Sequence, residues 1–330
     1  MPKPKLSPEA TIWTDARHAP LAGELMNLMG SAIKPIGVGG PPVKEVSGLA
    51  KSLDCQPQDD LRKLLVDRPA AYLLMTTLEG VTPDDLYSVT EQGTVVLTLE
   101  PIACDLQGLS AAKKLGSGSG SAGRILTVPM FSQSPGFLGA ADPYELLGDR
   151  RTVRFTGEGR PEHGSLFARL MDAWLTVLSF ALLPETIDAS LVGPPSERPD
   201  DPRLLTGSLL AHARMPGENA ALVEVTDTAG QTGRELRVQA HSASLRITDT
   251  AYTLRGPGGD LLDEAEESGP GSFVDMLAYQ WRRLLDRPNS ASSASHTQQQ
   301  ADAMACCLAC RLSIRTGQPE SPGKLLEMNR

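Results

Sequence analysis

The chain has 330 residues, of which 40% are apolar and 22% charged, which is typical of a globular protein long enough for two packed domains. Its formal net charge is −9, its pI is near 5.2, and its 31 Lys and Arg residues are scattered along the sequence. This distribution argues against a nucleic-acid partner, because phosphate binding needs a concentrated basic surface.

The sequence predicts neither a targeting signal nor a membrane-spanning segment. The start, MPKPKLSPEA, has lysines but no apolar run after them, so it does not resemble a secretory signal. The most apolar stretch, residues 170–183, contains Asp172 and is too short to cross a bilayer. We therefore expect a cytoplasmic protein without a membrane partner, in which this stretch is a buried helix.

The first part of the chain alternates short apolar runs with helical patterns. The predicted strands cover residues 10–14, 32–38, 71–77 and 95–99. The predicted helices cover residues 20–30, 43–53, 59–66, 82–93 and 104–116. Strands that are apolar throughout and alternate with helices predict a parallel sheet with helices on both faces. The expected fold is a Rossmann-like, doubly wound domain over residues 1–120.

The pattern changes after residue 124, where one long helix over residues 165–183 is followed by strands without helices between them. These strands cover residues 186–192, 208–215, 221–227, 234–240, 244–249 and 251–256. A series of this kind predicts a mostly antiparallel sheet. Two closing helices, residues 272–286 and 298–317, are expected to pack on it. The second domain, over residues 121–330, is therefore α+β.

Two sequence features resemble ligand sites, but neither is expected to be one. GSGSGSAG at residues 116–123 contains the letters G-x-G-x-x-G, but a dinucleotide loop follows a strand and opens a helix. Here a helix precedes it and a strand follows, so we expect a flexible connector. Cys306, Cys307 and Cys310 lie together without a second pair of ligands, so we expect buried thiols in a helix and no metal site.

Several segments in this order resemble one family. They include VLTLEPIA at residues 96–103, PETIDASL at residues 184–191 and the closing SIRTGQP at residues 313–319. Over residues 10–320 the arrangement is similar to the glucose-fructose oxidoreductase, inositol dehydrogenase and MocA (Gfo/Idh/MocA) group of NAD(P)-dependent oxidoreductases. The resemblance implies a two-domain fold, NAD or NADP as the cofactor if there is one, and a sugar or polyol-like substrate.

The family's nucleotide loop and its catalytic lysine are altered here. The family has a glycine-rich turn after the first strand, whereas this chain has Thr14, Asp15 and Arg17 there and no glycine before Gly23. The second strand ends in GVGGPP, without a side chain that could read a ribose or its phosphate. The position of the family's lysine holds Glu100, followed by Pro101.

The family's catalytic histidine, on the long helix of the second domain, falls on Asp172 or Ala173. If Glu100 and Asp172 face each other, the site favours a cation or a neutral polyol over an acid. The alternatives for these residues stay open. Glu100 either caps or pairs near the helix that starts at residue 105 or contacts a ligand, and Asp172 either forms an i,i+3 ion pair with Arg169 or lines the site.

The remaining polar candidates have structural alternatives of the same kind. Thr76 and Thr77 lie where parallel sheets bind ligands, at the carboxyl end of a strand, or satisfy backbone groups there. His18 and His163 are expected to be surface turn residues without acid–base roles.

The sequence therefore predicts an oxidoreductase-like protein whose cofactor and catalytic sites have degenerated. Its expected role is to bind a small molecule or a protein partner without catalysis. The alternative is an NAD(P)-dependent oxidoreductase acting on a sugar or a polyol-like substrate. The alternation of apolar and polar residues in strand 234–240 predicts one face against helices and one open face. We expect a homodimer through the open face, with Arg237 and His241 near the contact.

Overall fold

The computed structural model shows a chain divided into two compact units that interleave along the sequence. The described residues are 7–110, 125–147, 151–193, 199–265, 269–286 and 294–328. The first unit comprises Met1–Ile102, Ser110–Val128 and Val274–Pro288, and the second comprises Ala103–Leu109, Pro129–Phe273 and Asn289–Arg330. The domain boundary expected near residue 120 and the predicted connector at residues 116–123 lie outside the described residues.

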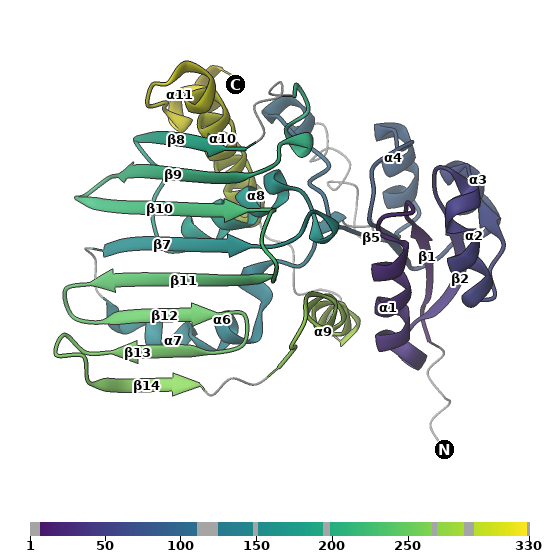
Figure 1. Cartoon of the computed structure of the whole chain (residues 1–330), viewed down its shortest axis with the longest axis horizontal. Coiled ribbons are helices and arrows are strands. Elements are labelled where there is room, and N and C mark those ends of the chain that lie inside the picture. The colour runs from purple at the N-terminus through teal and green to yellow at the C-terminus, as the bar shows by residue number, and fades with distance from the viewer. Residues whose placement is uncertain are drawn as a thin grey trace. The chain divides into compact units, whose positions relative to one another are not determined.

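The first unit is built on a six-stranded sheet with the order β3-β2-β1-β4-β5-β6, of which Figure 1 labels β1, β2 and β5. Its strands are β1 (Glu9–Trp13), β2 (Lys34–Gly39), β3 (Pro57–Gln58), β4 (Tyr72–Met75), β5 (Val95–Thr98) and β6 (Ile125–Thr127). Every neighbouring pair is parallel. This is the predicted Rossmann-like arrangement, and β1 and β4 end side by side at its centre.

Helices follow the strands in the expected order. They are α1 (Ala19–Met29), η1 (Gly30–Ala32), α2 (Val43–Ser52), α3 (Leu61–Asp67) and α4 (Pro83–Glu91). Two of them begin at side-chain caps: the Asp60 carboxylate accepts hydrogen bonds from two backbone amides of α3, and Thr82 forms a capping box with Asp85 at the start of α4.

Helix α9 (Phe273–Asp286) corrects one expectation. The sequence pattern placed it on the second domain, but from Val274 onward it belongs to the first unit. The Trp281 ring lies 6.0 Å from the Tyr72 ring of β4, and Arg282 donates a hydrogen bond to the Leu28 carbonyl. Helix amphipathicity predicts that a face is buried but not which surface covers it.

The second unit contains an eight-stranded sheet with the order β14-β13-β12-β11-β7-β10-β9-β8. Its strands are β7 (Arg151–Glu158), β8 (Thr186–Val192), β9 (Ser208–Met215), β10 (Asn219–Thr226), β11 (Gly233–Ala240), β12 (Ser244–Thr248), β13 (Tyr252–Arg255) and β14 (Leu261–Ala265). All neighbouring pairs are antiparallel except β7 and β10. The predicted mostly antiparallel sheet is confirmed. Strand β7, which lies in the middle of it, was not among the predicted strands.

Helices cover one face of this sheet (Figure 1). The described helices of the second unit are η2 (Phe131–Gln133), α6 (Pro135–Gly139), α7 (Ala141–Tyr144), η3 (Glu145–Leu147), η4 (Pro161–His163), α8 (Leu166–Val177), η5 (Pro202–Leu204), α10 (Ala294–Thr316) and α11 (Pro322–Met328). Helix α8 ends earlier than predicted, because Ser179 and Phe180 donate to carbonyls three residues back, which tightens the last turn.

The predicted burial of the α10 thiols is confirmed. Cys306, Cys307 and Cys310 are each 0% exposed within the core of the second unit. In the described part of the chain, the helices all fall short of the length and apolarity that a membrane crossing requires.

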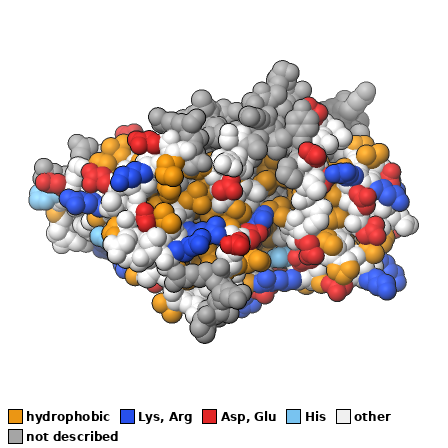
Figure 2. All heavy atoms as spheres, turned by 90° about the horizontal axis from the view of Figure 1, so that it is seen from above, with side chains coloured by type: hydrophobic (Ala, Val, Ile, Leu, Met, Phe, Trp, Pro, Cys, Tyr) orange, Lys and Arg blue, Asp and Glu red, His pale blue; other side chains and the backbone are white. Residues whose placement is uncertain are grey.

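The apolar and polar side chains of β11 lie on opposite faces of the strand, as its sequence predicts. Leu236, Val238 and Ala240 are buried under the helices, whereas Glu235 on the opposite face pairs with Arg237 and with Arg246 of β12. No described helix of the second unit covers that opposite face (Figure 1). On the surface shown in Figure 2, acidic and basic side chains of the described residues are interspersed, and neither sign forms an extended patch.

Candidate functional site

The candidate site lies in the first unit, where β1 and β4 end. The Thr76 amide donates to the Trp13 carbonyl at 3.0 Å, which continues the pairing of the two strands past their last residues. Beyond it, the Thr76 hydroxyl donates to the Thr14 hydroxyl at 2.7 Å. Two of the predicted site residues are therefore in direct contact at the edge where open α/β sheets bind ligands.

Asp15 is held in the turn that follows β1. Its Oδ1 accepts hydrogen bonds from the His18 amide at 2.9 Å and from His18 Nδ1 at 2.7 Å. Burial acts to raise the pKa of Asp15, but hydrogen bonds from His18 and Thr77 outweigh that effect and leave this pKa below its ordinary value. Asp15 is therefore an ionised carboxylate at neutral pH, fixed in place by its own turn.

This turn uses the amides that would otherwise bind a phosphate at the start of α1. The Ala19 amide donates to the Asp15 carbonyl at 2.9 Å, the His18 amide is taken by the Asp15 carboxylate, and Pro20 has no amide hydrogen. A dinucleotide pyrophosphate normally binds to free amides at this helix terminus. Here the Asp15 carboxylate of the protein itself binds the His18 amide, in place of a pyrophosphate.

The end of β2 is closed by tight backbone packing. The Gly40 amide donates to the Gln58 carbonyl at 3.0 Å, and a Cβ atom on Gly40 would lie 1.5 Å from the Thr14 carbonyl oxygen. A Cβ on Gly39 would lie 2.9 Å from the Trp13 ring. These glycines are therefore required by the approach of β1 and β3, without any need for a phosphate to explain them.

Glu100 follows β5 and is half-buried. Its amide donates to the Thr98 hydroxyl at 3.1 Å, and that hydroxyl donates to the Glu100 carbonyl at 2.9 Å, so a local turn fixes its backbone. The helical turn after residue 105 is capped by Asp105, whose carboxylate accepts the Gly108 amide at 2.6 Å. Asp105 therefore caps this turn. The pairing considered for Glu100 and the contact of Glu100 with a ligand stay predictions, as does a ligand contact of Pro101.

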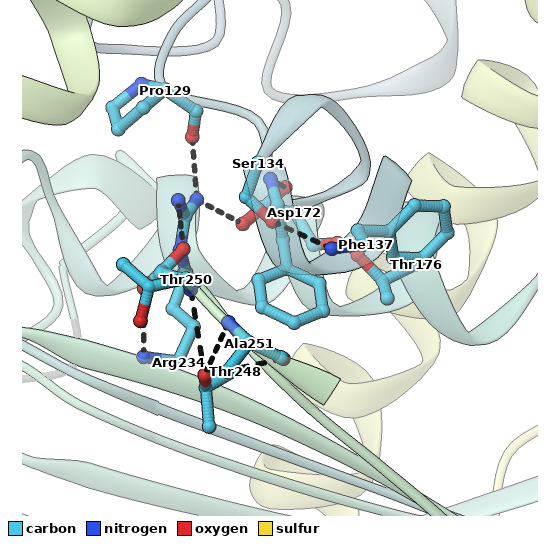
Figure 3. Close-up of polar contacts among 11 residues, drawn as sticks. Pro129, Ser134, Phe137, Asp172, Thr176, Arg234, Thr248, Thr250 and Ala251 are labelled. Carbon is cyan, nitrogen blue, oxygen red and sulfur yellow. Dashed lines mark hydrogen bonds and ion pairs between the residues drawn. The ribbon is translucent and has the colours of Figure 1, made fainter. Parts of the chain in front are cut away.

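In the second unit, Asp172 on α8 forms part of a buried ion cluster (Figure 3). Its Oδ2 accepts from Arg234 Nη1 at 2.9 Å, and its Oδ1 accepts from the Phe131 amide at 2.9 Å. Arg234 also donates to the Pro129 carbonyl at 2.7 Å and to the Asp249 carboxylate at 2.6 and 3.0 Å. One guanidinium therefore joins α8, the chain after β6 and the end of β12.

This cluster overturns the ion pair considered between Asp172 and Arg169, because the Arg169 guanidinium instead donates to backbone carbonyls, including those of Arg160 and Gly164. Burial raises the pKa of Asp172, and the nearby Arg234 guanidinium opposes that rise. Ala173, the other position at which the family's catalytic histidine was expected to fall, is 0% exposed. Within its own unit, Asp172 thus has partners for both of its carboxylate oxygens.

Neither histidine is the surface turn residue that the sequence suggested. His18 is only 8% exposed, and His163 stacks on Phe273 with ring centroids 4.2 Å apart while its Nδ1 bonds to the Thr232 hydroxyl. Arg17 is exposed in the same turn as His18. The D-x-x-H spacing at residues 15–18 was a usable signal for the Asp15–His18 pair. The partners of Arg234 are distant in sequence and gave no local signal.

No known protein-family model matches the sequence, and no curated protein does. Solved structures do share the fold. Levoglucosan dehydrogenase, in complex with NADH and L-sorbose, matches with a TM-score of 0.70 and 11% identity over 96% of this chain and 99% of that one. An oxidoreductase from Agrobacterium radiobacter, in complex with NAD+, L-tartaric acid and magnesium, has a TM-score of 0.70 and 11% identity over 97% and 99%. UDP-N-acetylglucosamine 3-dehydrogenase from Acidithiobacillus ferrooxidans has a TM-score of 0.66 and 11% identity over 94% and 98%. The chain therefore has the two-domain α/β fold of these oxidoreductases.

Proposed function

We propose that this protein binds a small hydroxylated molecule, such as a sugar or a polyol, and does not bind NAD or NADP in the manner of its structural neighbours. The observation that carries the proposal is the turn of residues 14–19. The His18 and Ala19 amides are bound to Asp15, Pro20 next to them has no amide hydrogen, and the pKa of the Asp15 carboxyl is below its ordinary value. A pyrophosphate at the start of α1 would meet a negative charge and would lack these amides as hydrogen-bond donors.

The ligand class rests on the neighbours and on the polar groups at the sheet edge. Two of the similar structures are sugar dehydrogenases by name, and one of them holds L-sorbose. At this edge the hydroxyls of Thr14 and Thr76 are buried and bonded to each other, and the Asp15–His18 pair lies beside them in the turn. The carboxylate and imidazole of that pair match the hydroxyl groups of a neutral polyol as hydrogen-bonding partners.

Thermal unfolding with added ligands tests the proposal. A ligand that binds the native state raises the melting temperature. We expect no shift with NAD(H) or NADP(H) at millimolar concentration, and an upward shift with at least one of L-sorbose and myo-inositol. For the dinucleotides, Asp15→Asn is the matched variant, because it removes the charge and keeps the size of the side chain. A clear rise with either dinucleotide in the unsubstituted protein would refute the proposal.

A second candidate is an NAD(P)-dependent sugar or polyol oxidoreductase, and it is favoured by the fold shared with NAD-bound and NADH-bound enzymes. In that case Glu100, at the position of the lysine in the resembling family, is the residue expected to act beside the substrate. Glu100→Gln should then lower the rate of nicotinamide reduction while leaving the melting temperature close to that of the unsubstituted protein. Unchanged turnover in this variant would exclude that role for Glu100.

A further inference from the structure

The Asp15–His18 pair leaves one ring nitrogen of a nearly buried histidine without a protein partner. His18 is 8% exposed, and its Nδ1 is bound to Asp15 Oδ1 at 2.7 Å. Among the described residues, Nε2 takes part in no hydrogen bond. Polar atoms in such surroundings normally have a partner from the protein, from water or from a ligand.

The chemistry of Asp15 fixes which nitrogen is available. An ionised carboxylate only accepts hydrogen bonds, and the pKa of Asp15 lies below its ordinary value because hydrogen bonds from His18 and Thr77 outweigh the effect of burial. The ring hydrogen of neutral His18 must therefore lie on Nδ1, pointing to Asp15. Nε2 then carries the lone pair and accepts a hydrogen bond from whatever lies beside it.

We infer that His18 Nε2 is the anchoring group of the ligand site and accepts a hydrogen bond from a hydroxyl of a neutral sugar or polyol. A hydroxyl supplies the hydrogen that Nε2 requires and brings no charge. An anion is disfavoured, because the Asp15 carboxylate lies on the other side of the same ring. This inference deepens the proposed function and rests on it for the class of ligand.

Nitrogen NMR of protein labelled with 15N-histidine tests the inference directly, with the His18 signals identified by their loss in His18→Gln. We expect the Nδ1–H tautomer for neutral His18. We also expect L-sorbose or myo-inositol to shift its Nε2 resonance more than that of any other histidine. His18→Gln should weaken the affinity for that compound about tenfold. His212→Gln, on the exposed face of β9, is the matched control and should leave the affinity unchanged.

Asp15→Asn distinguishes a ligand-binding role of the Asp15–His18 pair from a merely structural one. An amide can donate as well as accept, so His18 should lose its preference for the Nδ1–H tautomer, and affinity should fall as in His18→Gln. The inference is overturned by an Nε2–H tautomer in the unsubstituted protein, by the absence of a ligand-induced shift with both compounds, or by full affinity in His18→Gln. A dinucleotide that raises the melting temperature while L-sorbose still shifts Nε2 refutes the proposed function and supports this site.

Discussion

Replacing Arg234 with methionine is expected to destabilise the second unit by about 3–5 kcal/mol. Methionine keeps much of the aliphatic length but removes the guanidinium from between two acidic side chains. Arg234 is 11% exposed, and Asp172 and Asp249 are 14% and 21% exposed. Breaking a buried ion pair from one side is costly, because the charge left behind has lost its partner without regaining water.

The geometry indicates a value near the lower end of that range. Asp172 keeps its hydrogen bond from the Phe131 amide, and Asp249 keeps one from the backbone amide of residue 234 at 3.1 Å. Each carboxylate therefore retains one donor. Adding Asp172→Asn to the methionine variant removes one of the two unpaired charges and should restore about 1–3 kcal/mol.

The loss should also depend on pH, with a definite sign. Burial already raises the pKa of Asp172 while Arg234 opposes the rise, so removing Arg234 raises it further. A carboxyl whose folded-state pKa exceeds its unfolded value destabilises the protein above that pKa and ceases to do so as it protonates. The difference between Arg234→Met and the unsubstituted protein should therefore shrink as the pH falls from 7 towards 4.

Urea unfolding at pH 7 and at lower pH measures these differences as changes in the free energy of unfolding. The reasoning is refuted if the free energy of unfolding of Arg234→Met lies within about 1 kcal/mol of that of the unsubstituted protein. It is also refuted if adding Asp172→Asn destabilises the methionine variant further. Arg154→Met provides the surface control, because its ion pair with Glu224 is half-exposed and such pairs contribute little.

Three other outcomes are expected. A thiol reagent should modify Cys306, Cys307 and Cys310 only as the protein unfolds, since burial raises the pKa of all three thiols; mass spectrometry of native protein that finds any of them labelled would contradict this. Asp15 should stabilise the fold at neutral pH and lose that contribution as the pH falls through its lowered pKa, so the acid end of the stability profile should flatten in Asp15→Asn. Finally, light scattering should give about twice the monomer mass of 35.1 kDa, and Arg237→Glu on the open sheet face should reduce it to the monomer; a monomer at micromolar concentration before any substitution would end the dimer prediction.

Most strands of both sheets could be predicted because periodicity is local. In β9, apolar and polar residues alternate except at Leu210, and the predicted bounds are those of the structure. Strand β7 was missed because RTVRFTGE contains two arginines and a glycine, which dilute its apolar signal. Its position between β11 and β10 is what buries Val153 and Phe155, and that position is a property of the whole sheet.

The candidate site was only partly predictable for the same reason. Thr14, Asp15, Thr76 and Thr77 were identified from their positions at strand ends, and the structure joins them through hydrogen bonds. The burial of His18 depends on elements that surround the turn and not on its neighbours in sequence. Likewise, Asp172 pairs with Arg234, which lies 62 residues away, whereas helix spacing offered only the nearby Arg169.

The interleaving of the two units has a consequence for how the protein is made. Helix α9, which places Trp281 against Tyr72, is synthesised after every strand of the second unit. On the ribosome, the parallel sheet emerges early but lacks this helix until nearly the whole chain has been translated. A gene fragment that stops at residue 120 would leave the α9-facing side of Tyr72 uncovered. Expression of the first unit alone therefore requires residues 274–288 to be joined to it by an engineered linker.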